Sequence, residues 1–390
     1  MSTQIPVNPA ILRWAREGAG LSFEDVAKKL KLKSITANNV SSWENGEGSP
    51  SYAQLEKLAY EIYKRPLALF FFPEPPKEET PKQAFRTLPD QEIQRMSPRI
   101  RYLVRQARAM QINLDELYDG ANPAQNQIVR DLKYPPNTSI SKMVVDVRKY
   151  LKVQLPDQLQ WRNPESAFKA WRKALEDCGV FVFKEAFKNN TFSGFCLYHD
   201  RFPIIYVNNS QSPNRQIFTL FHELAHLLLG TGGVDTPLEN YVNYLHGDDK
   251  WIEVSCNSFA GAFLVPDEDF NLRIKALSVV DNTVSELADM YCVSREVILR
   301  KLLDRNLIDE HYYKNKVEQW RKSTVNKRKR PGGNSYHTKK AYLGIRYLDL
   351  VFSRLYQKRI TVEQVAEYLA VKVKNVPGME EMLYQKEVAA

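Results

Sequence analysis

One buried helix constrains the fold of this chain more than any other segment. Residues 215–230 read RQIFTLFHELAHLLLG, and their apolar side chains occupy every side of a helix rather than one stripe. This pattern predicts a helix enclosed by the core, with Gly230 as a natural end. His222 and His226 lie four residues apart and therefore share one face, so both imidazoles can bind a single ion, and Glu223 projects beside them.

The sequence His-Glu-Leu-Ala-His at 222–226 has the spacing of a zinc peptidase centre. Such a centre needs two nitrogen ligands and a carboxylate that takes a proton from water on the metal. The chain has only six histidines, so chance explains the pattern poorly. The alternative is a pair of hydrogen-bonded core histidines, because a buried helix must satisfy these groups in some way. We favour the metal site, with Glu223 as the general base.

A second helix is predicted to supply the third ligand. The segment WIEVSCNSFAGAFLVP follows a loop-rich stretch, and Glu253 is its lone carboxylate, which is costly unless it is paired or binds metal. His246, Asp248 and Asp249 in the loop compete, but a helix fixes ligand geometry better than a loop does. A metzincin site is excluded, because its motif requires a third histidine at position 232, where this chain has a glycine.

A change of hydrophobic period precedes the His-Glu helix. GVFVFKEA, SGFCLYHD and FPIIYVNN, at 179–186, 193–200 and 202–209, are β-rich runs separated by turn residues. We predict a small antiparallel sheet that leads directly into the helix. A substrate backbone added as a strand at the sheet edge would lie beside the metal.

The N-terminal residues predict a compact helical domain. Asn8 with Pro9 opens a first helix, Ser22 a second, Ser34 or Thr36 a third, and Ser51 a fourth. The third helix follows a tight turn, which is a helix-turn-helix arrangement.

This domain also carries a family resemblance. EDVAKKL followed by VSSWENGEGSPSYAQLEKLA resembles the Xre/Cro-type helix-turn-helix family, in which Trp-Glu-x-Gly closes the recognition helix. The resemblance makes residues 37–44 the recognition helix. Its polar side chains, able to meet base edges or phosphates, are Asn38, Asn39, Ser41 and Ser42.

The preceding turn is one or two residues longer than is usual in that family. Residues 1–72 hold nine basic and seven acidic side chains, so weak DNA binding by one copy is predicted, requiring a homodimer or a second basic surface. The alternative is a helix-turn-helix that contacts only protein.

The two metal-site segments together resemble the ImmA/IrrE-type metallopeptidases. HELAHLLLG is followed, 27 positions after its second histidine, by ExxCNxFAGxFLVP, and members often carry an N-terminal Xre-type domain. Over roughly residues 80–310, the resemblance implies His222, His226 and Glu253 as ligands and Glu223 as base. Zn²⁺ is the expected cofactor, with Mn²⁺ an alternative. Cys256 replaces the family's alanine, and since both are small we expect no change in role.

Length and composition indicate a multidomain, mainly α protein with an α+β core. The chain has 390 residues, of which 43% are hydrophobic. No apolar run reaches about 18 residues and the first nine are no signal peptide, so we expect a cytoplasmic protein. We predict four regions: a helix-turn-helix domain at 1–76, a helical linker region at 77–178, a zincin-like metallopeptidase core at 179–310, and a basic C-terminal helical region at 311–390.

The net charge of +9 belongs to the C-terminal fifth. Residues 310–390 hold 17 Lys and Arg against 8 Asp and Glu, while the first 309 residues hold 38 of each. A nucleic-acid or acidic-protein contact therefore competes with a solvated helical face. Residues 283–308 and 361–369 each mimic a further helix-turn-helix, and we interpret the former as structural.

These features predict a regulatory zinc metalloendopeptidase fused to a DNA-binding domain. The family resemblance implies a transcriptional repressor, itself of the Xre type, as the protein that is cut. The alternative is a DNA-binding regulator or toxin–antitoxin component whose metal site is structural or sensory. A third hypothesis is cleavage of the chain's own linker near residues 73–90. Tyr241, Tyr244 and His246 are candidates for oxyanion stabilisation.

Overall fold

The computed structural model describes residues 7–78, 93, 96–135, 137–161, 163–188, 192–231, 233–235, 247–275, 281–324 and 335–384. The chain forms two compact units, residues 1–106 and 107–390, and the boundary falls inside helix α7 (Pro98–Leu117). No described helix is long and apolar enough to span a bilayer. The predicted class, mainly helical with a small sheet, is confirmed.

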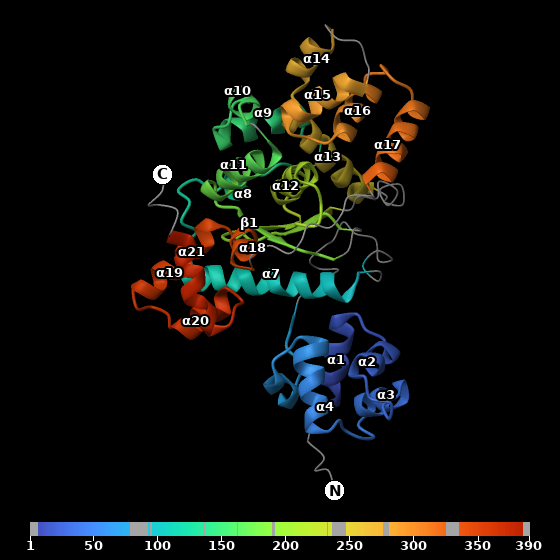
Figure 1. Ribbon diagram of the computed structural model, residues 1–390, viewed down its shortest axis with the longest axis vertical. Coiled ribbons are helices and arrows are strands. Elements are labelled where there is room, and N and C mark those ends of the chain that lie inside the picture. The colour runs from blue at the N-terminus through green and yellow to red at the C-terminus, as the bar shows by residue number, and fades with distance from the viewer. Residues whose placement is uncertain are drawn as a thin grey trace. The chain divides into compact units, whose positions relative to one another are not determined.

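The first unit contains the predicted helix-turn-helix (Figure 1). Its helices begin where the capping residues predict, because Asn8, Ser22 and Ser51 each accept a backbone N–H of the first turn. Their apolar faces enclose one core. The elements are α1 (Pro9–Ala19), α2 (Phe23–Leu30), α3 (Ala37–Asn45), α4 (Tyr52–Lys57), η1 (Leu58–Tyr63) and η2 (Leu67–Phe71).

A buried ion pair fastens α3 to α1. Arg16 donates to both carboxylate oxygens of Glu44, from Nε at 2.7 Å and from Nη2 at 2.9 Å. The Arg16 side chain is 13% exposed and that of Glu44 is 2% exposed. Glu44 of the Trp-Glu-x-Gly stretch therefore holds the recognition helix in place and does not face a ligand.

Replacing Glu44 by Gln should destabilise the first unit by about 3 kcal/mol, because it removes the buried charge partner of Arg16 and leaves only the exposed Glu17 carboxylate at 3.5 Å. Denaturant-dependent hydrogen exchange of the amides in residues 9–63 measures this. Exposed Glu47, three residues on, is the matched control, and Glu47→Gln should change stability by less than about 0.5 kcal/mol. Equal protection in both variants would contradict the role of the ion pair.

The second unit is built on a four-stranded sheet of order β1-β3-β2-β4. The strands are β1 (Phe181–Glu185), β2 (Gly194–Leu197), β3 (Ile204–Asn208) and β4 (Val234–Asp235). The prediction of an all-antiparallel sheet was wrong, since β1 pairs with β3 in parallel. β2 and β3 form the expected antiparallel hairpin. In the sheet, β3 lies between β1 and β2, and it runs parallel to β1.

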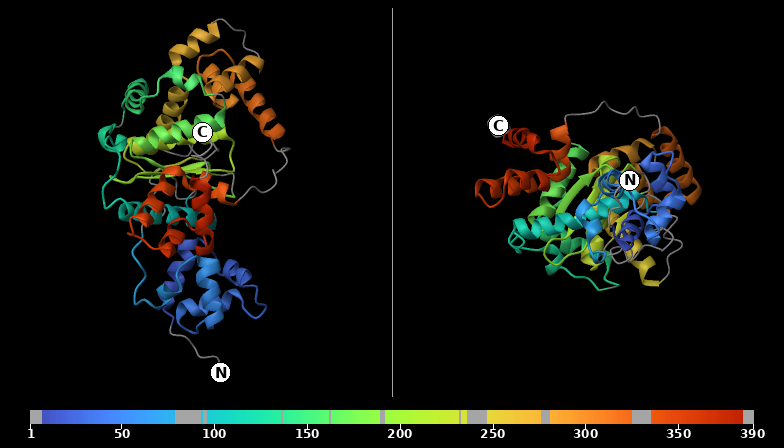
Figure 2. Two further views of the ribbon diagram at one scale, coloured as in Figure 1. Left: turned by 60° about the vertical axis from the view of Figure 1, so that its left-hand side comes forward. Right: turned by 90° about the horizontal axis from the view of Figure 1, so that it is seen from below.

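One face of the sheet is covered by the helices that form the main core (Figures 1 and 2). Helices α12 and α13 pack on each other, and α9 and α11 pack against α13 and α12 respectively. The core includes Trp171, which meets Phe221 edge-on at 4.8 Å between ring centroids. These helices are α8 (Ile128–Asp131), α9 (Ile140–Leu151), α10 (Leu155–Leu159), α11 (Pro164–Asp177), α12 (Pro213–Leu228) and α13 (Gly247–Leu264).

The opposite face of the sheet is covered by C-terminal helices and the end of α7 (Figure 2). Phe183 of β1 meets Tyr347 edge-on at 5.5 Å, and Gln111 of α7 donates to the carbonyls of Leu197 and Phe202. The C-terminal elements are α18 (Ser335–Leu343), α19 (Ile345–Tyr356), α20 (Val362–Tyr368), η4 (Val373–Asn375) and α21 (Val376–Tyr384).

Several C-terminal cations are used within this unit. Arg346 pairs with Asp177 at 3.2 Å, and both Arg354 and Arg359 pair with Asp119. These ion pairs lie at the surface, so they fix orientation more than they stabilise the fold. Some of the basic residues in the C-terminal region therefore hold its helices against the rest of the second unit.

The second helix-turn-helix-like segment is embedded in the core of the unit. Helices α15 (Asp281–Tyr291) and α16 (Arg295–Leu303) contribute Leu287, Ile298 and Leu299 to the main core. Helix α17 (Glu310–Thr324) packs on α16, and Arg295 stacks on Trp320. A covered α16 supports a structural role for this segment. Helix α14 (Asp267–Lys275) completes the unit.

Candidate metal centre

Helix α12 forms where the apolar run predicts. Ser212 accepts the backbone N–H of Arg215, and Pro213 occupies the first helical position, where its missing N–H loses nothing. The chain leaves the helix at Gly230, whose φ of +72° favours glycine.

Glycines allow the sheet to approach α12 closely. A Cβ on Gly194 of β2 would lie 2.4 Å from the Thr219 side chain. A Cβ on Gly233 would lie 2.2 Å from Cδ2 of His226. Any larger residue at either position would push the helix away from the strands, so both glycines set the depth at which the histidines lie.

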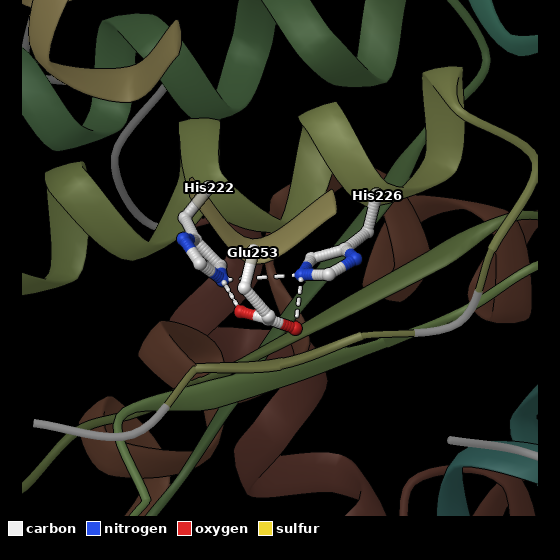
Figure 3. A group of neighbouring side chains, drawn as sticks. All are labelled: His222, His226 and Glu253. Atoms are coloured by element: carbon white, nitrogen blue, oxygen red, sulfur yellow. Dashed lines mark hydrogen bonds and ion pairs between the residues drawn. The ribbon is translucent and has the colours of Figure 1, made fainter. Parts of the chain in front are cut away.

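Helices α12 and α13 bring together the three predicted ligands (Figure 3). Nε2 of His222 lies 3.5 Å from Oε2 of Glu253, and Nε2 of His226 lies 3.3 Å from Oε1. The two Nε2 atoms are 3.2 Å apart. All three side chains are at most 1% exposed. Helix α13 begins at Gly247, one turn earlier than predicted, and this places Glu253 well inside the helix.

The hydrogen-bond partner of Nδ1 determines the tautomer of each histidine. Nδ1 of His222 lies 3.1 Å from Oδ1 of Asn257, and Nδ1 of His226 lies 3.2 Å from Oγ1 of Thr231. The Thr231 hydroxyl donates to the His226 carbonyl, so its oxygen is left to accept from Nδ1. We assign the proton to Nδ1 in both rings, which turns the lone pair of each Nε2 inward.

This arrangement fits a cation. Two inward lone pairs 3.2 Å apart repel each other unless a positive charge lies between them, and a fully buried carboxylate also needs one. Burial alone would raise the pKa of Glu253, and its lowered pKa requires positive charge beside the carboxylate, which protonated His226 and His222 or a bound metal would supply. Two imidazole nitrogens and a carboxylate are a donor set that zinc accepts.

Thr231 and Asn257 should control metal affinity without touching the metal. We expect Thr231→Val and Asn257→Leu each to weaken Zn²⁺ binding about 10- to 100-fold, because loss of the outer hydrogen bond releases the ring orientation. Competition with a chromophoric chelator measures this. Thr231→Ser keeps the hydroxyl and should bind as the wild type does. Thr231→Val affinity equal to that of Thr231→Ser would overturn the assignment.

The predicted general base, Glu223, is fully buried beside His222 on α12. Cys196 of β2, a strand that packs against α12, is its neighbour. Burial raises the pKa of the Cys196 thiol well above its ordinary value, and the Glu223 carboxylate adds to the shift. The Cys196 sulfur accepts the N–H of Gly233 at 3.2 Å. Cys256 is also buried, and within the described residues all four cysteines are unbridged thiols.

Two segments of the chain match known protein families. Residues 175–303 match the IrrE N-terminal-like domain, a peptidase family, and residues 12–59 match a helix-turn-helix family. The chain joins an IrrE-like peptidase-family domain to a helix-turn-helix domain. These matches confirm the predicted resemblance to an ImmA/IrrE-type protein with an N-terminal helix-turn-helix. No curated protein matches the chain.

The IrrE-like domain contains all four residues predicted for the metal centre. The loop candidates Tyr241, Tyr244 and His246 lie outside the described residues, while Asp248 and Asp249 fall in the first turn of α13. Sequence reasoning missed Thr231, because a threonine after a helix end has no distinguishing pattern. Asn257 lies four residues after Glu253, on the same face of α13.

The helix-turn-helix domain presents the predicted DNA-contacting residues unequally. Asn38 is exposed, whereas Ser41 and Ser42 are half-buried, and the Ser42 hydroxyl donates to the Asn39 carbonyl. Oδ1 of Asn39 accepts from both the backbone and the hydroxyl of Thr36, which caps α3. Only the amide nitrogen of Asn39 is left for a base or phosphate, so Asn38 is the more accessible of the two asparagines.

Proposed function

We propose that the protein is a regulatory metallopeptidase that cuts a protein partner, with a transcriptional repressor as the substrate. The convergence of His222, His226 and Glu253 in one buried site carries this proposal, together with Glu223 one residue from the first ligand. The match to a peptidase family supports it. A helix-turn-helix joined to a peptidase-family domain is the arrangement of a DNA-binding regulator.

The residues of the site divide the chemistry among them. His222, His226 and Glu253 would hold Zn²⁺, with Mn²⁺ an alternative by ligand type. A metal held there would supply a Lewis acid for a peptide carbonyl and would lower the pKa of water. The Glu223 carboxylate accepts a proton from the attacking water and returns it to the departing amine nitrogen. The raised pKa of the Cys196 thiol keeps this neighbour of Glu223 uncharged.

A second function is favoured by one observation. The three ligand residues are almost completely buried, and a closed site is typical of structural metals rather than catalytic ones. On this view the protein is a DNA-binding regulator or toxin–antitoxin component whose metal is structural or sensory, and a partner protein is held but not cut.

One experiment separates the two functions. The purified protein is incubated with Zn²⁺ and the product of the neighbouring gene, and new N-termini are identified by mass spectrometry. The peptidase proposal predicts a single cut in that product which a chelator prevents. An uncut product, together with DNA binding that is lost when the metal is removed, would favour the sensory site. A fragment ending near residues 73–90 would instead indicate cleavage of the chain's own linker.

A further inference from the structure

The recognition helix of the first unit carries no cation with which to neutralise DNA. Helix α3 reads ANNVSSWEN, and its only charged side chain, Glu44, is paired with Arg16. Most of the affinity of a protein for duplex DNA comes from Lys and Arg at phosphates. If the first unit binds DNA, as we propose for its helix-turn-helix, its cations must lie elsewhere on its surface; this inference rests on that DNA-binding role.

The three arginines within residues 7–78 all make contacts within the fold. Arg13 donates to the Glu44 carbonyl, Arg16 pairs with Glu44, and Arg65 pairs with Glu78 and stacks on Trp14. Lys57 donates to the Leu30 carbonyl and so caps α2. Further ionic contacts of Arg16, Arg65 and Lys57 would require breaking these interactions, whereas Arg13 is tied to α3 through Nη2 and keeps a half-exposed side chain.

The remaining basic side chains concentrate in one place. Within residues 7–78, six lysines have exposed side chains with no ion pair or hydrogen bond. Four of the six fall within six consecutive residues, at the end of α2 and in the turn before α3. We call these four, Lys28, Lys29, Lys31 and Lys33, the turn lysines; the other two are Lys64 and Lys77.

Helix stability accounts for only part of this cluster. Lys28 and Lys29 lie in the last turn of α2, where a cation is favourable near the helix dipole. Lys31 and Lys33 lie beyond that helix, and Lys31 adopts a left-handed conformation with φ of +56°, which turns the chain toward α3. The longer turn thus adds two cations that the helices themselves do not need.

The turn also lies next to the exposed end of the recognition helix. Thr36 caps α3, and Asn38 is exposed in its first turn, five residues after Lys33. Helices α2 and α3 pack together, as Figure 1 shows for the blue unit. We infer that the turn lysines form a phosphate-binding surface for the backbone of duplex DNA, beside the base-reading end of α3.

The salt dependence of DNA binding tests this inference. The full-length protein is titrated onto a fluorescent duplex of about 25 base pairs and arbitrary sequence, between about 50 and 200 mM salt. Each lysine that neutralises one phosphate contributes about 0.9 to the slope of log K against log salt. We expect the K31Q/K33Q protein to have a slope shallower by about 1.8, and to bind more weakly at every salt concentration.

Lys64 and Lys77 provide a matched control of equal charge change. The K64Q/K77Q protein should keep the wild-type slope, and both variants should keep the wild-type circular dichroism and melting temperature, since all four side chains are exposed. A K31Q/K33Q slope equal to that of wild type, or an equal fall in the control, would overturn the inference while leaving DNA binding intact.

Two further outcomes separate this inference from the proposed function. Wild-type protein that fails to bind duplex DNA would remove both the DNA-binding function and the phosphate surface, with no bearing on the peptidase. Displacement of the duplex by poly-L-glutamate at equal charge concentration would assign the turn lysines to an acidic protein partner, and would overturn the DNA assignment.

Discussion

The Glu223→Gln protein is expected to bind metal as the wild type does and to have lost cleavage of the partner protein. Glutamine preserves the shape of the side chain but cannot take a proton from water, and a general base typically contributes about 100- to 10,000-fold to the rate. Elemental analysis should give one metal per chain in both proteins. The rate of appearance of the new N-terminus measures cleavage.

The buried position of Glu223 makes a folding control necessary. The melting temperature of the metal-loaded variant should match that of the wild type, because the ligands His222, His226 and Glu253 are unchanged. Exposed Glu268 of α14 is the comparison residue, and Glu268→Gln should cut normally. A Glu223→Gln protein that cleaves at the wild-type rate would remove the base from the mechanism.

Replacing Glu253 by Gln should weaken metal binding about 1,000-fold. Glutamine removes the negative charge that would face the cation, and a charge interaction is worth about 4 kcal/mol at the effective dielectric of protein sites. Since each 1.4 kcal/mol is tenfold in affinity, this corresponds to about 1,000-fold. A metal that binds only the folded state raises stability with its concentration. The rise in melting temperature on adding Zn²⁺ should therefore vanish in this variant.

The metal-free proteins distinguish a metal site from a pair of core histidines. If Glu253 exists to bind a cation, Glu253→Gln in the presence of a chelator should be neutral or stabilising, because it removes an uncompensated buried charge. If Glu253 is instead a structural partner of His222 and His226, the same change should destabilise the protein by about 3–5 kcal/mol with or without metal. Glu268→Gln should change neither measurement.

Much of the local structure was predictable because its causes are local. Asn8, Ser22 and Ser51 cap helices through their own first turns, and Thr36 forms a capping box with Asn39, as sequence patterns predict. The metal ligands were equally accessible, since His222 and His226 share a helical face by spacing alone. Glu253 could be predicted as the third ligand because a lone carboxylate in an apolar helix is costly unless it is paired or binds a metal.

The relation of β1 to β3 was not predictable from the runs themselves. Three short β-rich segments joined by turns favour an antiparallel meander. The amino-acid composition of such a short strand does not reveal whether it will pair in parallel or antiparallel. The insertion of β3 between β1 and β2 depends on packing of the whole sheet between two helical layers. The embedding of α15 and α16 in the main core is likewise a property of the assembled unit.

The sequence by itself determined which residues have the chemistry for a metal centre, because spacing on a helix depends on a fixed repeat. Only the tertiary structure decided that both histidines direct Nε2 inward, because their outer partners, Thr231 and Asn257, come from a helix end and a second helix. It also decided which cations of the first unit are occupied by the fold and which are exposed in the turn before α3. The charge of a side chain follows from the sequence, whereas its freedom to bind a ligand depends on what the folded chain places beside it.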